Sequence, residues 1–265
     1  MKRTTYILMG LIGSGLIMIV AFFVLVFLLA QPRERDKLFV GGEPAEMNMD
    51  GIRVVKVSVR QSDDKNHVYI LGEMTLANAA AAGGERKAVY PKNDYLKVSR
   101  TKDTLLLELD FTTPNLPEQQ QTKSYIYTDG LAVQIYADTL TSILCPTDGL
   151  DLKLKQLATD SISICGGYQD IVLDSCRLHY LSIDGKRVSF EAKKSEIDNL
   201  HLNLDRINRW SLDSCKIDTE YLRGSGHHRN HLQTGECRKV MWVPAGENAR
   251  LELTFPQKSS ISVEP

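Results

Sequence analysis

The feature that most constrains the fold is a rhythm of short apolar segments, about ten residues apart, between residues 150 and 224. Apolar and polar side chains alternate within these segments, as where Leu150, Leu152 and Leu154 are each followed by a charged residue. Successive side chains of a strand point to opposite faces, so this alternation predicts half-buried β-strands. We expect strand centres at residues 162–164, 171–173, 181–183, 188–190, 200–204 and 210–212.

The same region contains a short internal repeat. The tetrapeptide Leu-Asp-Ser-Cys occurs at residues 173–176 and again at 212–215, an interval about twice that between Cys145 and Cys165. Such intervals suit stacked coils of about 20 residues, each with two short strands. The sequence therefore predicts an all-β fold, a parallel β-solenoid or β-helix. The alternative is an antiparallel β-sandwich, because short strands at this spacing also fit that architecture.

The N-terminal region is apolar over a long stretch. Residues 4–32 carry no charge, and the apolar centre of this run spans residues 6–30. As a helix this centre would be about 37 Å long, against about 30 Å for a hydrocarbon core. The run is longer than the apolar part of a cleaved signal peptide, which is about 7–15 residues. We expect a signal-anchor, with the membrane as a partner over residues 6–30 and no cleavage.

Lys2 and Arg3 precede this run without an acidic residue, which favours a cytoplasmic N-terminus. The sequence thus predicts a single-pass bacterial inner-membrane protein whose residues 32–265 lie on the exported, periplasmic side. Residues 1–31 would be a short cytoplasmic tail and transmembrane helix, 32–50 a tether and 51–112 an N-terminal β-strand region. Residues 113–124 would be a loop, and 125–265 the solenoid repeats with a C-terminal cap.

The layout resembles the bacterial head GIN-domain family, which is provisionally described as autotransporter adhesins. The resemblance begins with the strand at residues 51–59 and continues with a strand, polar turn and strand over residues 95–109. It extends through the short-strand ladder at residues 131–144 and 150–212. It implies a β-helical, non-catalytic protein of the cell envelope.

The five cysteines are Cys145, Cys165, Cys176, Cys215 and Cys237. Coil spacing suggests the pairs Cys145–Cys165 and Cys176–Cys215, although the second pair would be two coils apart and too distant to bond. An exported compartment permits disulfides. The competing interpretation, which we favour, is that these cysteines are small apolar residues filling the core.

A histidine cluster at His227, His228 and His231 stands beside glycines, with Cys237 close behind. Imidazole and thiolate groups are ligands for transition metals. The glycine-rich context favours a surface loop, so we predict no metal, cofactor or catalytic residue here.

Carboxylates recur along the repeat, and aligned on one face with basic residues they would suit a calcium site or a carbohydrate-cleaving groove. Turn and solvent-facing positions are the more usual explanation for them. Trp210, Trp242 and Tyr221 offer rings for stacking on sugars, and we expect Trp242 to pack in the cap. The carboxylates are Asp170, Asp174, Asp184, Asp198, Asp205, Asp213 and Asp218, and the basic residues are Lys193, Lys194, Arg206 and Arg209.

The composition excludes some functions. Lys and Arg total 32 against 33 Asp and Glu, a net charge of -1, so the clustered positive charge that nucleic-acid binding needs is not indicated. We therefore predict a membrane-anchored envelope protein that binds or scaffolds without catalysis, with a protein or glycan as partner. The alternative is an enzyme that processes an envelope polysaccharide through Asp pairs in a groove.

Overall fold

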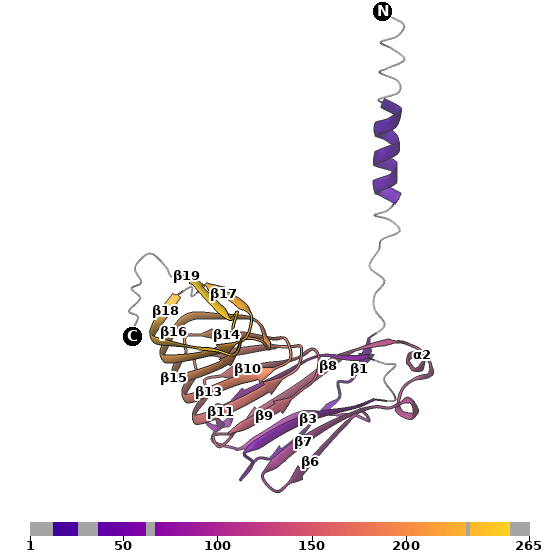
Figure 1. Ribbon diagram of the computed structural model, residues 1–265. Coiled ribbons are helices and arrows are strands. Elements are labelled where there is room, and N and C mark those ends of the chain that lie inside the picture. Colours follow the sequence, from indigo (N-terminus) through magenta and orange to yellow (C-terminus); the bar gives the residue numbers. More distant parts are fainter. Residues whose placement is uncertain (1–12, 26–36, 62–66, 232–233, 255–265) are drawn as a thin grey trace, which may run out of the picture. The chain divides into compact units, whose positions relative to one another are not determined.

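The computed structural model describes residues 13–25, 37–61, 67–231 and 234–254 (Figure 1). The chain divides into two compact units, Met1–Asp36 and Lys37–Pro265. The second unit contains the strands. They are β1 (Leu38–Phe39), β2 (Glu43–Asn48), β3 (Val54–Gln61), β4 (His67–Ala77), β5 (Lys87–Lys92), β6 (Leu96–Thr101), β7 (Thr104–Phe111), β8 (Tyr125–Tyr136), β9 (Ser142–Cys145), β10 (Leu150–Lys155), β11 (Ala158–Gly166), β12 (Asp170–Asp174), β13 (Arg177–Gly185), β14 (Val188–Lys193), β15 (Glu196–Asn203), β16 (Ile207–Gly224), β17 (His227–His231), β18 (Thr234–Pro244) and β19 (Arg250–Thr254).

Most of these strands belong to one of two parallel ladders. The first ladder runs β8–β4–β10–β12–β14–β16, and the second runs β7–β3–β9–β11–β13–β15–β16–β18. The long strand β16 serves both, because residues 207–213 pair with β14 and residues 216–223 pair with β15. Figure 1 shows β11, β13 and β15 as neighbouring arrows of the second ladder.

A recurring turn connects the two ladders. Gln156, Ser175, Lys194 and Ser214 each adopt a left-handed backbone, with φ between 48° and 57°. The amide of Gln156 donates to the carbonyl of Asp174 over 2.9 Å, so each turn is hydrogen-bonded to the next. This column of turns fixes the register of every strand that follows it.

The core lies between the ladders. Ile171, Phe190 and Trp210 stand in register and point inward from the first ladder, and Leu181 and Leu200 do so from the second. All five side chains are buried in one continuous apolar cluster. The alternation in the sequence therefore predicts correctly which side of these strands faces the core.

The predicted parallel β-solenoid, or β-helix, is wrong. Seventeen strands form one large mixed sheet with a sandwich-like layout, in which β2 pairs with β5, β5 with β8 and β6 with β7 in antiparallel fashion. The prediction fails in the first part of the strand unit, because antiparallel strand pairs take the place of the repeat there. The observed layout is closer to the alternative prediction, a β-sandwich. Most of the strand pairs are parallel, however, whereas that alternative predicts antiparallel pairs.

The predicted transmembrane helix is also wrong. In the described part of the chain no helix combines the length and apolarity needed to cross a membrane. Residues 6–12 and 26–30 of the predicted span lie outside the described residues. The signal-anchor, single-pass inner-membrane localisation and periplasmic placement of residues 32–265 are corrected with it.

Short helices and a small second sheet complete the strand unit. The 3-10 helix η1 (Ala79–Ala82) ends at Gly83, whose left-handed φ of 71° stops it. The predicted loop at 113–124 contains η2 (Thr113–Asn115) and α2 (Glu118–Gln121). Strands β17 and β19 pair in parallel as a separate two-stranded sheet.

Candidate functional site

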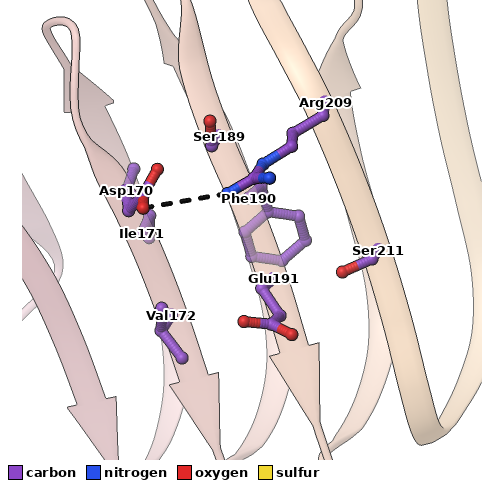
Figure 2. Close-up of a pocket in the computed structure, with 8 residues that line it drawn as sticks. All are labelled: Asp170, Ile171, Val172, Ser189, Phe190, Glu191, Arg209 and Ser211. Carbon is purple, nitrogen blue, oxygen red and sulfur yellow. Dashed lines mark ion pairs between the residues drawn. The ribbon is translucent and has the colours of Figure 1, made fainter. Parts of the chain in front are cut away.

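A hollow of about 380 Å³ lies on the outer face of the first ladder, across β12, β14 and β16 (Figure 2). Residues 170, 189 and 209 stand in one register row, and residues 172, 191 and 211 stand in the next. The ladder therefore places side chains distant in sequence side by side on rigid strands. The lining residues are Asp170, Ile171, Val172, Ser189, Phe190, Glu191, Arg209 and Ser211.

An ion pair crosses the hollow. The guanidinium of Arg209 reaches past Ser189 on the middle strand to Asp170, with 3.9 Å between Nη2 and Oδ2 (Figure 2). The reach is possible because Ser189, between them in register, has a short side chain. Glu191 pairs with Lys193 two residues further along the same strand, at 3.1 Å. The hollow thus presents guanidinium donors, carboxylate acceptors and serine hydroxyls together.

The carboxylate next to the hollow is in a different environment. Asp151 on β10 is the register neighbour of Asp170, and its Oδ1 accepts the backbone N–H of Asp170 at 3.1 Å. Burial raises the pKa of Asp151, and it outweighs that hydrogen bond, which lowers it. Further along the row, the hydrogen bond from Lys153 lowers the pKa of Glu73. Asp151 is therefore a carboxyl on this face whose pKa is raised by burial.

The two carboxylates inside the hollow are poorly suited to act as a general acid. The side chains of Asp170 and Glu191 are 52% and 40% exposed, and each already faces a cation. A general acid in glycoside cleavage needs a carboxyl whose pKa is raised by burial. Exposed, ion-paired carboxylates suit hydrogen bonding to a ligand instead.

The outer face of the second ladder carries a column of rings. The ring centroids of Tyr180 and His201 are 4.8 Å apart, and those of His201 and Tyr221 are 4.2 Å apart and nearly parallel. Burial lowers the pKa of His201 and so favours its neutral imidazole in this column. Beside it, His179 contacts Asp198 at 2.6 Å, and that hydrogen bond raises the pKa of His179. Of the aromatic residues singled out from the sequence, Tyr221 joins this column and Trp210 is buried in the core.

The histidines of the predicted cluster contact different partners. His227, His228 and His231 lie on strand β17 instead of a loop. His227 approaches Glu252 at 3.6 Å, and His228 lies 3.0 Å from Asp205, whose pKa is lowered chiefly by the backbone N–H of Ser225. Within the described residues, no group of three potential ligand side chains comes together as a metal site. The side chain of His231 lies outside them.

His228 also helps place the predicted cap. Its ring packs edge-on against Trp242, with 6.2 Å between the centroids. Trp242 is partly buried against the apolar core, in agreement with its predicted packing role.

The cysteines are separated by the ladder geometry. Cys145 and Cys165 lie on neighbouring strands, but the first is buried and the second points outward, so the suggested pair cannot form. Cys176 and Cys215 are both buried, and Ser195, which accepts the N–H of Cys176, lies in the turn between them. All five thiols are free.

The predicted carboxylates are dispersed too. Asp170 alone lines the hollow, while Asp184 lies 3.8 Å from Arg206 and Asp218 lies 3.5 Å from Arg238. The structure pairs Arg209 with Asp170, as the aligned-face hypothesis requires. Asp174, Asp213 and Lys194 belong to the edge where the chain turns between ladders.

Sequence reasoning missed four polar or ring residues of these faces: Ser189, Glu191, Tyr180 and His201. The repeat length of the sequence could have identified these residues. Positions one repeat apart fall in the same register row on neighbouring strands, so listing residues by the repeat length would have placed Ser189 between Asp170 and Arg209.

No family model and no curated protein matches the sequence. Three solved structures are similar at a distance. A provisionally described lipid binding protein from Parabacteroides distasonis is 8% identical, with a TM-score of 0.37 over 83% of this chain and 98% of that chain. A provisionally described adhesin from Parabacteroides merdae is 9% identical, with a TM-score of 0.32 over 82% of this chain and 99% of that chain. A provisionally described cell adhesion protein from Clostridium sporogenes is 11% identical, with a TM-score of 0.22 over 81% and 100%.

These likenesses are too remote to assign a function to this chain. They agree with the adhesin-like resemblance in name only, and no family model supports a head GIN domain.

Proposed function

We propose that the strand unit is a non-enzymatic binding module that holds a glycan in the hollow on β12, β14 and β16. The observation that carries this proposal is the row in which Arg209, Ser189 and Asp170 stand side by side. Sugars present adjacent hydroxyls that both donate and accept, and this row offers donors, an acceptor and a hydroxyl at strand spacing, about 4.8 Å.

The shape of the site favours a glycan over a protein partner. The hollow is concave, as ligand sites are. The centre of a protein interface is usually anchored by a large exposed aromatic or aliphatic side chain. Here Phe190 and Ile171 are buried beneath the strands, which leaves Val172 as the apolar part of the accessible lining.

Rigidity supports binding with little loss of entropy. The backbone of all three strands is held in parallel ladders, so the positions of Arg209, Ser189 and Asp170 along the row are set before a ligand arrives. A preorganised site spends less of its interaction free energy on ordering side chains when a ligand arrives.

The test is calorimetric titration of the full chain with oligosaccharides selected on a glycan array. Arg209→Ala should weaken binding at least about tenfold, which corresponds to about 1.4 kcal/mol. The matched control is Arg177→Ala, which removes another exposed arginine, paired with Glu196 at 3.0 Å on the second ladder. Unchanged affinity in Arg209→Ala, equal loss in the control, or binding of a protein but no glycan would refute the proposal.

A second candidate function is hydrolysis of the bound glycan, because Asp151 has a raised pKa and adjoins Asp170. In that case Asp151 would donate a proton and Asp170 would act as the base or nucleophile. Incubating the bound oligosaccharide with the protein and measuring new reducing ends decides between the two. Turnover that Asp151→Asn abolishes would replace the binding proposal with an enzymatic one.

A further inference from the structure

The last complete repeat places an acid in the core. Glu220 on β16 stands in register between Leu200 on β15 and Val240 on β18. Its side chain is fully buried, and among the described residues neither carboxylate oxygen has a hydrogen-bond partner. A buried carboxyl group without a partner is costly when it is charged and much less so when it carries a proton. Glu220 is therefore a group whose ionisation this end of the core opposes.

The neighbours of Glu220 do not offset a negative charge. Leu200 and Val240 are apolar, and Trp210 points inward from the first ladder with an indole N–H that has no partner within the described part of the chain. The small sheet turns Leu251 toward the same core, as part of its apolar lining. The environment of the carboxyl group is accordingly apolar on the side of each ladder.

Two thiols are the titratable groups that act on Glu220. They belong to Cys237 on β18 and to Cys215 earlier on β16, and neither can become positively charged. The thiol of Cys237 also has an acceptor on its own strand, the carbonyl of Lys239, with 3.4 Å between sulfur and oxygen. The thiols therefore give an ionised Glu220 little stabilisation.

The charged side chains of the small sheet are engaged with other partners. His228 on β17 lies 3.0 Å from Asp205, and Arg229 donates to Glu252 on β19 over 2.9 Å. Both pairs have their own counter-charges, and the second is exposed to solvent. Ionisation of Glu220 is therefore relieved by water and not by these cations.

The strand that covers Glu220 at the end of the second ladder is only partly buried. Val240 and Trp242 on β18 pack against the core without being enclosed, whereas Leu200 on the other side of Glu220 is fully buried. β18 is also the last strand of this ladder, and it pairs with β16 over residues 213–224. Detaching β18 therefore brings water to Glu220 while disturbing few buried side chains, as in a local opening.

We propose that Glu220 is a pH-sensitive switch that controls whether β18 stays on the end of the second ladder. While Glu220 holds its proton, β18 remains paired with β16. When the proton passes to solvent, β18 detaches and water surrounds the carboxylate. Detachment uncovers the backbone edge of β16 together with the buried side chains of Ile217 and Leu222. Such an edge can accept another strand.

The direction of the switch follows from burial. Burial raises the pKa of Glu220 to about 7 in the closed structure, against an ordinary value of 4.5 for the exposed group. The closed form therefore holds the proton more tightly than the open form. It is favoured at low pH, and its advantage is lost as pH rises from about 4.5 through about 7.

The switch is separate from the proposed glycan site. Arg209 belongs to residues 207–213 of β16, which pair with β14, whereas Glu220 lies on the half that pairs with β15 and β18. We therefore expect Arg209→Ala to leave the switch unchanged, and Glu220→Gln to leave glycan binding at the hollow unchanged.

Cys237 reports the detachment, because it is a partly buried thiol of β18 whose register partner Ile217 faces the core. The experiment measures alkylation of each cysteine of the full chain at pH 5 and pH 8 by peptide mass spectrometry. Each rate is divided by the rate of the urea-unfolded chain at the same pH, which removes the ordinary titration of the thiol. The corrected rate of Cys237 should be at least about tenfold higher at pH 8.

Cys145 serves as the reference for global unfolding, because it is buried on β9 in an earlier part of the ladder. If the opening is local, Cys145 should react at least about tenfold more slowly than Cys237 at pH 8. Equal rates would show that the whole strand unit unfolds, which would overturn the inference.

Two variants and a matched control complete the test. Glu220→Gln removes the charge and should reduce the pH effect on Cys237 to less than about twofold, and Glu220→Leu should do the same if the glutamine variant does not fold. Glu196→Gln removes an exposed glutamate of β15, paired with Arg177, and should keep the full effect. The inference is also overturned if the corrected rate of Cys237 does not rise with pH, or if the rise survives in the Glu220 variants.

Discussion

A buried acid in the last complete repeat leads to a quantitative prediction. Glu220 stands in the inward row that Leu181 and Leu200 occupy in the preceding repeats, and it is 0% exposed. Among the described residues, neither carboxylate oxygen has a hydrogen-bond partner of good geometry. Replacing Glu220 with Leu continues the apolar row and should stabilise the protein.

The magnitude follows from the pKa. Burial raises the pKa of Glu220 from 4.5 to about 7, and the thiol of Cys237 nearby opposes this only weakly. The folded state therefore holds the proton more tightly than the unfolded state, so stability falls as pH rises above about 4.5 and levels off above about 7. This difference in pKa corresponds to about 3 kcal/mol, most of which lies between pH 5 and pH 8.

The assay is urea unfolding of the wild type and Glu220→Leu at pH 5 and pH 8, followed by tryptophan fluorescence. Trp210 lies on the same strand as Glu220, so its signal reports this end of the ladder. The gain in unfolding free energy should be larger at pH 8 by about 2–3 kcal/mol. Glu220→Gln, which removes only the charge, should lose the same pH dependence. An equal gain at both pH values would refute the argument.

Three further predictions concern single contacts. Gly167→Ala places a Cβ atom in steric conflict with the carbonyl oxygen of Thr147, and should lower the unfolding free energy by about 1–3 kcal/mol in urea titration. Phe190→Ala empties a fully buried core position and should cost about 3–5 kcal/mol in the same measurement, with a loss under about 1 kcal/mol contradicting its central place. The imidazole of His179 should titrate above its ordinary pKa by NMR, because of its hydrogen bond to Asp198, and Asp198→Asn should bring that pKa down.

The strands of the repeat could be predicted from the sequence, because alternation reports burial directly. The predicted centre at 181–183 lies within β13, and that at 188–190 lies within β14. The alternation of apolar and polar residues could not distinguish the antiparallel pairs at the start of the strand unit from the parallel ladders. Side chains alternate between the two faces in both antiparallel and parallel strands, so the sequence pattern does not indicate the direction of pairing.

The candidate sites were predictable only in part. Asp170 and Arg209 were both recognised as possible groove residues, but their contact depends on the register of three successive strands of the first ladder. Glu220 escaped notice because an acid at an inward position violates the alternation that identifies the strand.

The column of left-handed turns also determines which deletions from the chain would preserve the inward and outward sides of the strands. Ser175 and Lys194 hold equivalent places in consecutive turns, so excising residues 175–193 would join Asp174 to Lys194 without reversing any later side chain. A cut longer or shorter by one residue would turn the following strand's apolar row to the solvent. The molecule can therefore be shortened by whole repeats while its remaining strands keep their inward and outward sides.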